Sequence, residues 1–263
     1  GSTFKPFVYA TAIMNLGMTP CSTVSNATYT KGDWVVEGKG GNLTLRDALA
    51  HSKNPVAVRL IESVSPKKVI QLARDLGVTE EMPNEYAIAL GSSDITIYEM
   101  LGAYSSFANF GNYIKPEMVW RIEDANGRVI KEVKNETKEV MNEMYAYTMI
   151  DLMKGVTRFG TASGELRRMG IPETVEIAGK TGTTQNNSDG WFMGITPNLA
   201  TGVWVGWEDR ATHFFSTGEG QGAKMALPIW GIFMKKVWAD KELGITPDDK
   251  FAKPSNWTGD CAD

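Results

Sequence analysis

Ser2-Thr3-Phe4-Lys5-Pro6 opens the chain, and an apolar run from Phe7 to Leu16 follows it. Proline fits only within the first turn of a helix, and Gly17 is a typical helix end, so the pattern predicts one helix that begins near Ser2. Residues three positions apart share a helix face, which puts Lys5 one turn beyond Ser2. The opening stretch therefore predicts a serine hydroxyl beside a lysine amine, on a helix apolar enough to be buried.

Two further polar motifs follow in order, Ser52-Lys53-Asn54 and Lys180-Thr181-Gly182-Thr183. A serine followed by a lysine three places on is expected about once by chance in a chain of this length, and Ser65-Pro66-Lys67-Lys68 is such a match, interpreted as an exposed helix start. The motif at Lys180 is expected far less often, roughly 0.05 times. Together the motifs supply a nucleophile, two lysines and a second hydroxyl, the groups of an acyl-transfer site that works without histidine.

Proton transfer at such a site requires an uncharged lysine. A free lysine has a pKa of about 10.4 and is almost always charged at pH 7. Burial and a second cation both lower a lysine pKa, and Lys180 is the candidate second cation for Lys5. The helix N-terminus favours an alkoxide on Ser2, and Ser52 is a candidate proton relay between the lysines and a leaving amine.

Composition sets the outer limits of function. The chain has 263 residues, 42% of them hydrophobic, which is enough for one domain with a subdomain. The net charge of −4 and a pI near 5.4 argue against nucleic-acid binding. No apolar stretch approaches the roughly 18 residues of a membrane span, and the first ten residues lack the order of a signal peptide. The sequence shows no metal-binding cluster.

The only two cysteines are Cys21 and Cys261. Two cysteines this far apart in sequence do not form a disulfide framework, so we interpret them as free thiols. A single bridge that ties down the tail stays open as the alternative.

Local patterns divide the rest of the chain into helical and β regions. Residues 43 to 110 are predicted to be mostly helical, with Thr44 as a cap and Pro66 as a helix start. An Asn-Gly pair at Asn126-Gly127 predicts a hairpin, and residues 141 to 157 return to helical spacing. Three β-runs are predicted next, at Thr174 to Ala178, Trp191 to Ile195 and Thr201 to Trp207. A last helix is predicted from Ala223 to Ala239, and the tail from Lys250 onward is expected to be poorly ordered.

Aromatic residues gather in the last third of the chain. We expect them to fill the core because they recur at strand or helix spacing. They are Trp191, Phe192, Trp204, Trp207, Trp230 and Trp238.

The chain resembles the transpeptidase domain of class A, bifunctional penicillin-binding proteins. The resemblance rests first on the three motifs at Ser2, Ser52 and Lys180. It extends to Ala108-Asn109-Phe110-Gly111-Asn112-Tyr113, Asp189-Gly190-Trp191-Phe192-Met193-Gly194 and Val203-Trp204-Val205-Gly206. The likeness covers nearly the whole chain.

The resemblance implies an α+β fold, an antiparallel sheet flanked by helices with a mainly helical subdomain, as in penicillin-binding proteins and serine β-lactamases. The transpeptidase domain would cover residues 1–250, with a tail or linker at 251–263. The family's domain begins many residues before the nucleophile, so its N-terminal elements are lacking in this chain and an upstream piece is expected to complete the sheet.

The resemblance also implies a function, D-Ala-D-Ala transpeptidation of peptidoglycan stem peptides through an acyl-enzyme on Ser2. Lys5 would be the general base, and Ser52 with Lys180 would pass a proton to the leaving group. The backbone N–H groups of Ser2 and Thr183 would form the oxyanion hole. Asn54, Thr181, Gly182 and Thr183 would bind the substrate, and the site would use no cofactor and no metal.

The partners implied are stem peptides and β-lactams, which would acylate Ser2. In the full-length protein, the family carries an upstream glycosyltransferase domain and a membrane anchor. The resemblance therefore implies a location in the bacterial cell envelope, on the periplasmic face of the cytoplasmic membrane, with the anchoring segment absent from this chain.

Other functions stay open at this point. A Ser-His-Asp hydrolase is disfavoured because the only histidines are His51 and His213 and no Gly-x-Ser-x-Gly turn is present. A serine β-lactamase or D,D-carboxypeptidase shares the motifs, but no Glu-x-x-Leu-Asn segment supplies a deacylating glutamate. A β-lactam sensor domain would acylate without turnover, and a scaffold without activity would not acylate at all.

Overall fold

The computed structural model describes residues 1–259 and residue 261. Its α-helices are α1 (Lys5–Leu16), α2 (Leu45–Ala50), α3 (Asn54–Val64), α4 (Pro66–Asp75), α5 (Ile97–Ala108), α6 (Glu143–Arg158), α7 (Ser163–Arg168), α8 (Thr217–Gly220) and α9 (Gly222–Ala239). Short 3-10 helices are η1 (Ser2–Phe4), η2 (Tyr86–Leu90), η3 (Gln185–Asn187) and η4 (Lys241–Leu243). The strands are β1 (Thr23–Ser25), β2 (Tyr29–Lys31), β3 (Trp34–Val36), β4 (Asn42–Thr44), β5 (Asn112–Ile114), β6 (Arg121–Glu123), β7 (Val129–Glu132), β8 (Thr137–Glu139), β9 (Ala178–Thr183), β10 (Asp189–Thr196) and β11 (Leu199–Gly206).

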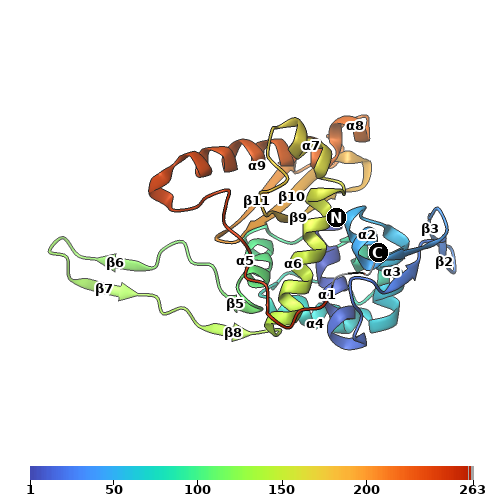
Figure 1. Ribbon diagram of the computed structural model, residues 1–263, viewed down its shortest axis with the longest axis horizontal. Coiled ribbons are helices and arrows are strands. Elements are labelled where there is room, and N and C mark those ends of the chain that lie inside the picture. Colours follow the sequence, from blue (N-terminus) through green and yellow to red (C-terminus); the bar gives the residue numbers. More distant parts are fainter. Residues whose placement is uncertain (260, 262–263) are drawn as a thin grey trace.

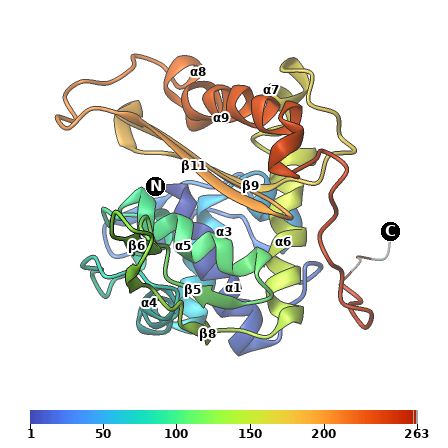
Figure 2. The same cartoon turned by 90° about the vertical axis from the view of Figure 1, so that its left-hand side faces the viewer.

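The elements form three layers (Figures 1 and 2). In the described part of the chain the central sheet has three antiparallel strands in the order β11-β10-β9. Helix α9 covers one face of the sheet, while α5 and α6 pack on the other and separate it from α1 and α3. This arrangement confirms the predicted α+β fold with a helical subdomain.

Local sequence signals fix several helix boundaries as expected. The Thr44 hydroxyl accepts a hydrogen bond from Asp47 N at the start of α2, and Pro66 opens α4. Helix α5 begins with a capping box formed by Thr96 and Glu99. Helix α1 ends at Gly17, whose φ of 63° lies in the left-handed region that favours glycine.

The predicted hairpin is present as β6 and β7, and Figure 1 shows it projecting from the body of the molecule. Asp124 Oδ1 accepts hydrogen bonds from Asn126 N and Arg128 N, both at 2.9 Å, and Gly127 has a φ of 78°. The turn is therefore held by the Asp124 side chain and by the left-handed backbone of Gly127, as the Asn-Gly pair indicates.

One predicted strand is wrong, and several short strands were not predicted. The run from Thr174 to Ala178 is not the first strand of the meander, because β9 begins at Ala178 and includes Lys180 to Thr183. The short strands β1 to β4 were not predicted, since three-residue strands are too short to show an alternating pattern.

The expected aromatic core is only partly correct. Phe192 and Trp230 are fully buried and meet edge to face at 5.1 Å. Trp204 and Trp207 are 42% and 66% exposed. The alternation of a strand places Phe192 on the buried face, but it does not reveal which outward positions face solvent.

The interpretation of Cys21 and Cys261 as free thiols is wrong, because the two residues form a disulfide across 240 positions of sequence. The tail before it is also packed onto the body. Trp257 is buried and its Nε1 donates to Thr148 Oγ1 at 2.9 Å, and Phe251 N donates to Glu176 Oε2 at 2.9 Å. The expectation of a poorly ordered tail is therefore wrong for its described residues, whereas residues 260, 262 and 263 lie outside them.

We expect the disulfide to stabilise the fold, because it closes almost the whole chain into a loop and so restricts the unfolded state. Cys261→Ser should lower the free energy of unfolding by about 2 to 4 kcal/mol. The midpoint of thermal unfolding, followed by circular dichroism, should fall by roughly 5 to 10 °C. Reductant should lower the wild-type midpoint to that of the variant and leave the variant unchanged.

Ser255→Ala in the same tail is the matched control, since Ser255 is exposed and no disulfide is lost. A wild-type midpoint that does not respond to reductant would contradict a stabilising bridge.

Candidate active site

Ser2 lies in η1, the 3-10 turn that leads into α1. The turn is held in place from the helical side, because the buried Tyr104 hydroxyl donates to Thr3 O at 2.6 Å. Thr3 and Phe4 are buried, while Ser2 is half-buried. The predicted helix therefore starts with a tighter turn, which presents Ser2 at its exposed end.

Ser52 lies in the short connection between α2 and α3. Its φ of 55° places it in the left-handed region, which is uncommon for a residue with a side chain. Two backbone hydrogen bonds hold the connection, from Ser52 N to Leu49 O at 3.0 Å and from Lys53 N to Ala48 O at 2.9 Å. The strained conformation is thus fixed by its surroundings, as is common where a side chain must be aimed at a site.

Two amines from distant parts of the sequence meet at the Ser52 hydroxyl. Lys5 Nζ lies 3.1 Å from Ser52 Oγ, and Lys180 Nζ donates to the same oxygen at 2.9 Å. Lys5 Nζ also donates to Ser52 O and to Asn54 Oδ1, both at 2.6 Å. The structure therefore brings Lys5, Ser52, Asn54 and Lys180 into one cluster, with one hydroxyl between two amines.

Both lysines are completely buried. Burial lowers the pKa of Lys5 well below its ordinary value, and the nearby charges of Lys180 and Lys53 lower it further. Burial lowers the pKa of Lys180 to about 7. Two amines that share a hydroxyl in a dry site do not both carry a charge at neutral pH, so one of them is available to accept a proton.

The three contacts of Lys5 can be made by a charged amine that donates to all three oxygens and also by a neutral amine. A neutral amine has two N–H groups and one lone pair, and Lys5 faces two carbonyl-type oxygens and one hydroxyl able to donate. Among the described residues, Lys5 Nζ has no hydrogen bond to Ser2 Oγ. Catalytic hydrogen bonds often tighten only when the substrate is bound, so this spacing is compatible with proton transfer.

Lys180 lies within β9, which is an edge strand of the central sheet among the residues that the structure describes. Strand β9 pairs with β10 on one side only, with Thr183 opposite Gly190 and Lys180 opposite Met193. Its other edge lies next to η1. An unpaired edge beside a serine is suited to hold an extended peptide by main-chain hydrogen bonds.

Gly182 has a packing role that the sequence did not reveal. A Cβ on Gly182 would lie 2.9 Å from Thr3 Cγ2 and 3.1 Å from Trp191 Cβ, and a Cβ on Gly1 would lie 3.1 Å from Thr183 O. The bare backbone therefore lets η1 and β9 approach each other. This approach sets the backbone N–H groups of Ser2 and Thr183 in the same neighbourhood.

The two threonines of the third motif already have partners within the protein. Thr181 Oγ1 lies 2.7 Å from Thr161 Oγ1, and Thr183 Oγ1 accepts a hydrogen bond from Gly222 N at 3.1 Å. Sequence reasoning missed Thr161, because nothing in its local pattern connects it with Thr181, which lies 20 residues later.

A cleft of about 810 Å³ opens next to the cluster. Ser2, Asn54 and Thr183 line it, so the nucleophile candidate faces open space. Other residues that line the cleft include Trp191, Trp204, Trp207, Asp94, Gln185, Asp189 and Arg210. Exposed tryptophans at this position are thus part of a cleft wall, and their exposure is consistent with ligand contact.

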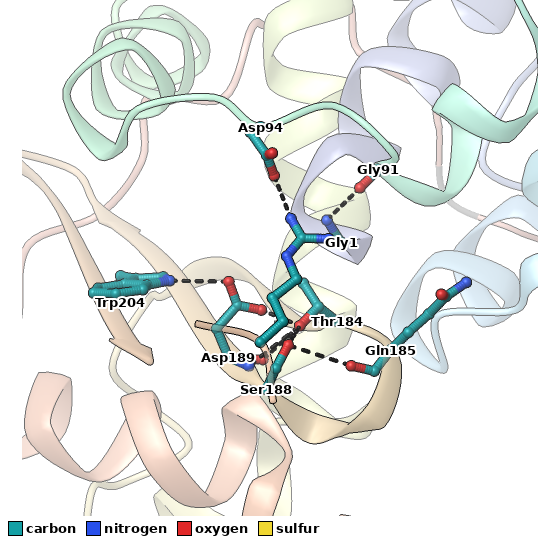
Figure 3. A network of polar contacts seen from close by, with 9 residues as sticks. Gly1, Gly91, Asp94, Thr184, Gln185, Ser188, Asp189 and Trp204 are labelled. Atoms are coloured by element: carbon teal, nitrogen blue, oxygen red, sulfur yellow. Dashed lines mark hydrogen bonds and ion pairs between the residues drawn. The ribbon is translucent and has the colours of Figure 1, made fainter. Parts of the chain in front are cut away.

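Figure 3 shows polar contacts among several residues that line the cleft. Asp189 Oδ2 accepts from Trp204 Nε1 at 3.1 Å, and the Asp189 carboxylate also accepts from the Thr184 hydroxyl. Arg210 and Asp94, which both line the cleft, form an ion pair at 2.6 Å. Both partners are largely exposed, so this ion pair contributes little to stability.

The described residues contain no group of three or more His, Cys, Asp and Glu side chains arranged to hold a metal ion. No helix in the described part of the chain combines the length and apolar composition needed to cross a membrane.

The family model for the penicillin binding protein transpeptidase domain matches residues 1–207. The chain belongs to this family. The match includes all three polar motifs and the strands that follow them, so the clustered lysines, serines and threonines lie in a transpeptidase domain of the penicillin-binding protein type.

Curated relatives agree with this assignment. Penicillin-binding protein 1A of Aquifex aeolicus is 36% identical over 263 residues, covering 95% of this chain and 35% of the relative. Penicillin-binding protein 1A of Neisseria meningitidis is 34% identical over 260 residues, covering 92% of this chain and 32% of the relative. The chain therefore spans about a third of the length of these relatives.

Solved structures of penicillin-binding proteins share the fold. Penicillin-binding protein 1A from Haemophilus influenzae matches with a TM-score of 0.81 at 25% identity. The match covers 97% of this chain and 43% of the Haemophilus chain. The PonA1 protein from Mycobacterium tuberculosis in complex with penicillin V matches with a TM-score of 0.81 at 25% identity. The match covers 98% of this chain and 72% of the PonA1 chain.

Proposed function

We propose that this domain is a serine-type D-Ala-D-Ala transpeptidase that cross-links peptidoglycan stem peptides and is inhibited by β-lactams. The observation that carries the proposal is the position of Ser52 Oγ, 3.1 Å from Lys5 Nζ and 2.9 Å from Lys180 Nζ, in a site where both amines are buried. Family membership and the penicillin complex of PonA1 support the proposal.

In the first half-reaction, Ser2 Oγ attacks the carbonyl carbon of the penultimate D-Ala, and its proton passes to the neutral amine of Lys5. The carbonyl oxygen becomes an oxyanion held by the backbone N–H groups of Ser2 and Thr183. The C–N bond then breaks. The leaving D-Ala amine takes a proton from Ser52 Oγ, which regains one from the lysines on either side.

The substrate would lie along the open edge of β9. Its terminal carboxylate would face Lys180 and the hydroxyls of Thr181 and Thr183, and the Asn54 side-chain amide would bind the peptide. In the second half-reaction, an amine of a neighbouring strand attacks the acyl ester. The attacking amine loses a proton to the same relay, the ester bond between the acyl carbon and Ser2 Oγ breaks, and Ser2 Oγ takes a proton back from Lys5.

The wider setting follows from the same proposal. The relatives are about three times as long as this chain. By its resemblance to class A penicillin-binding proteins, the full-length protein would carry a glycosyltransferase domain and a membrane anchor upstream. The domain would work in the bacterial cell envelope, on the periplasmic face. The transpeptidase domain would end near residue 250, with the following segment fastened to its surface by the disulfide.

The direct test is mass spectrometry of the protein after incubation with benzylpenicillin, followed by digestion. We expect an increase equal to the mass of one penicillin, on the peptide that holds Ser2. Release of D-Ala from a D-Ala-D-Ala peptide, with transfer to an added amine, would distinguish a transpeptidase from a sensor domain. An adduct on another residue, or none, would contradict the proposal.

The pH dependence of acylation should follow the two lysines. At low pH Lys5 is protonated and cannot accept the Ser2 proton, so the acylation efficiency should rise with pH. Because the pKa of Lys180 is about 7, its charge is lost above neutral pH and the penicillin carboxylate loses its partner. We expect a bell-shaped profile in stopped-flow measurements, with a fall on the order of tenfold between pH 7 and pH 9.

Lys180→Arg tests which lysine causes the fall in acylation at alkaline pH, because a guanidinium keeps its charge throughout this pH range. Its absolute rate will fall, since arginine does not fit the lysine site, but its profile should lose the alkaline limb. If Lys180→Arg keeps the wild-type alkaline limb, Lys180 is not the group that titrates.

A further inference from the structure

The turn after α6 contacts both the end of α2, just before Ser52, and strand β9. It contains Gly160 and Thr161. Thr161 N donates to Ala50 O at 3.0 Å, two residues before Ser52, and Thr161 Oγ1 lies 2.7 Å from Thr181 Oγ1 on β9. A single residue thus links the Ser52 connection to the strand that carries Lys180.

The turn packs closely against neighbouring backbone. A Cβ on Gly160 would lie 2.2 Å from Ala50 O and 2.8 Å from Val156 Cα, so only glycine allows this approach of two backbones. One helical turn earlier, the Thr157 hydroxyl donates to Ile177 O at 2.5 Å, just before β9 begins. Thr161 is therefore held at a fixed position relative to both β9 and Ala50.

Either hydroxyl could donate in this pair, and counting protons shows which direction leaves Thr181 able to bind a carboxylate. Each hydroxyl has a single proton to donate, whereas an ionised carboxylate only accepts. If Thr181 donates to Thr161, it has no proton left for a substrate carboxylate. If Thr161 donates to Thr181, the Thr181 proton is free to point at the substrate, and the two hydrogen bonds strengthen each other.

The accessibility of the pair fits the second arrangement. Thr181 is 7% exposed, so its hydroxyl is restricted to few partners, while Thr161 is an exposed residue. Solvent can satisfy the free lone pairs of Thr161 when its proton is given to Thr181. Lys180 Nζ donates to Thr181 O at 2.9 Å, so positive charge lies next to the same residue.

We propose that Thr161 is a positioning residue of the carboxylate site: it donates its proton to Thr181 and thereby directs the Thr181 proton to the carboxylate of the stem peptide or the β-lactam. This inference rests on the proposed function. It adds a residue that contacts no reacting atom and acts only through Thr181.

The test is a double-mutant cycle on benzylpenicillin acylation with Thr161→Val, Thr181→Val and the double variant. Valine has the shape of threonine without the hydroxyl. Thr161→Val should weaken the non-covalent binding step about tenfold and change the acylation rate constant less than twofold, because the carboxylate contact is equally present before and after Ser2 attacks. Adding Thr161→Val to Thr181→Val should have no further effect.

Two controls separate positioning from a loss of structure. Thr161→Ser keeps the hydroxyl and should restore wild-type binding. Thr196→Val removes another threonine hydroxyl, whose 3.2 Å hydrogen bond to Leu199 O lies in the turn between β10 and β11, and should leave binding unchanged.

The outcomes are distinct. Wild-type binding by Thr161→Val would overturn the inference, as would additive losses in the cycle, which would mean that Thr161 contacts the substrate itself. Failure of Thr161→Ser to restore binding would also overturn it. No adduct on the wild-type protein would overturn the proposed function, and this inference with it.

Discussion

Ser2→Ala should abolish the covalent penicillin adduct. The hydroxyl is the only group of the proposed mechanism that forms a bond to the substrate, and removal of a catalytic nucleophile reduces the rate by about 10⁴-fold or more. Intact-mass spectrometry after prolonged incubation with benzylpenicillin measures the result. The fold should persist, because Ser2 is half-buried at the end of η1 and the hydrogen bond that pins the turn goes to Thr3 O.

The chain contains its own matched control for this variant. Ser65 also precedes a lysine by three residues, but it is exposed at the end of α3 and does not line the cleft that Ser2 lines. Ser65→Ala should acylate at the wild-type rate. If Ser2→Ala still accepts penicillin on another side chain, Ser2 is not the nucleophile and the proposed mechanism fails.

Lys5→Met should slow acylation by about 10³-fold without preventing it. Methionine has a similar length and no amine, so the Ser2 proton loses its acceptor, and general-base catalysis typically contributes about 10²- to 10⁴-fold. Burial and the nearby cations hold the pKa of Lys5 well below its usual range, which is what allows an amine to serve as a base near neutral pH. Stopped-flow acylation, with circular dichroism to confirm folding, gives the measurement.

Lys68→Met is the matched control for Lys5, because Lys68 belongs to the second Ser-x-x-Lys match and is exposed on α4. It should leave acylation unchanged. An acylation rate of Lys5→Met within tenfold of wild type would show that another group takes the proton.

Much of the local structure was predictable because its causes are local. Thr44 and Pro66 mark helix starts through contacts within one turn, and the Asn126-Gly127 pair makes its hairpin through a left-handed glycine. The groups of the site were also predictable. Their residue types and order along the chain identify the family, and the structure gathers Lys5, Ser52, Asn54 and Lys180 as expected.

Features that depend on distant contacts were not predictable. The Cys21–Cys261 disulfide spans 240 positions, and no local pattern reveals that the tail returns to the start of the chain. Thr161 has no motif of its own and gains a role only because the turn after α6 reaches both Ala50 and Thr181. The exposure of Trp204 and Trp207 depends on which outward positions of the strands other elements cover.

The sequence by itself therefore determined the chemical groups, their local backbone and the family. Only the tertiary structure decided their protonation and their mutual reach. Lys5 and Ser52 are 47 positions apart, and Lys180 follows Ser52 by 128. A lysine accepts a proton near neutral pH when other parts of the chain exclude water from it or bring a second cation close, and those conditions exist only after folding.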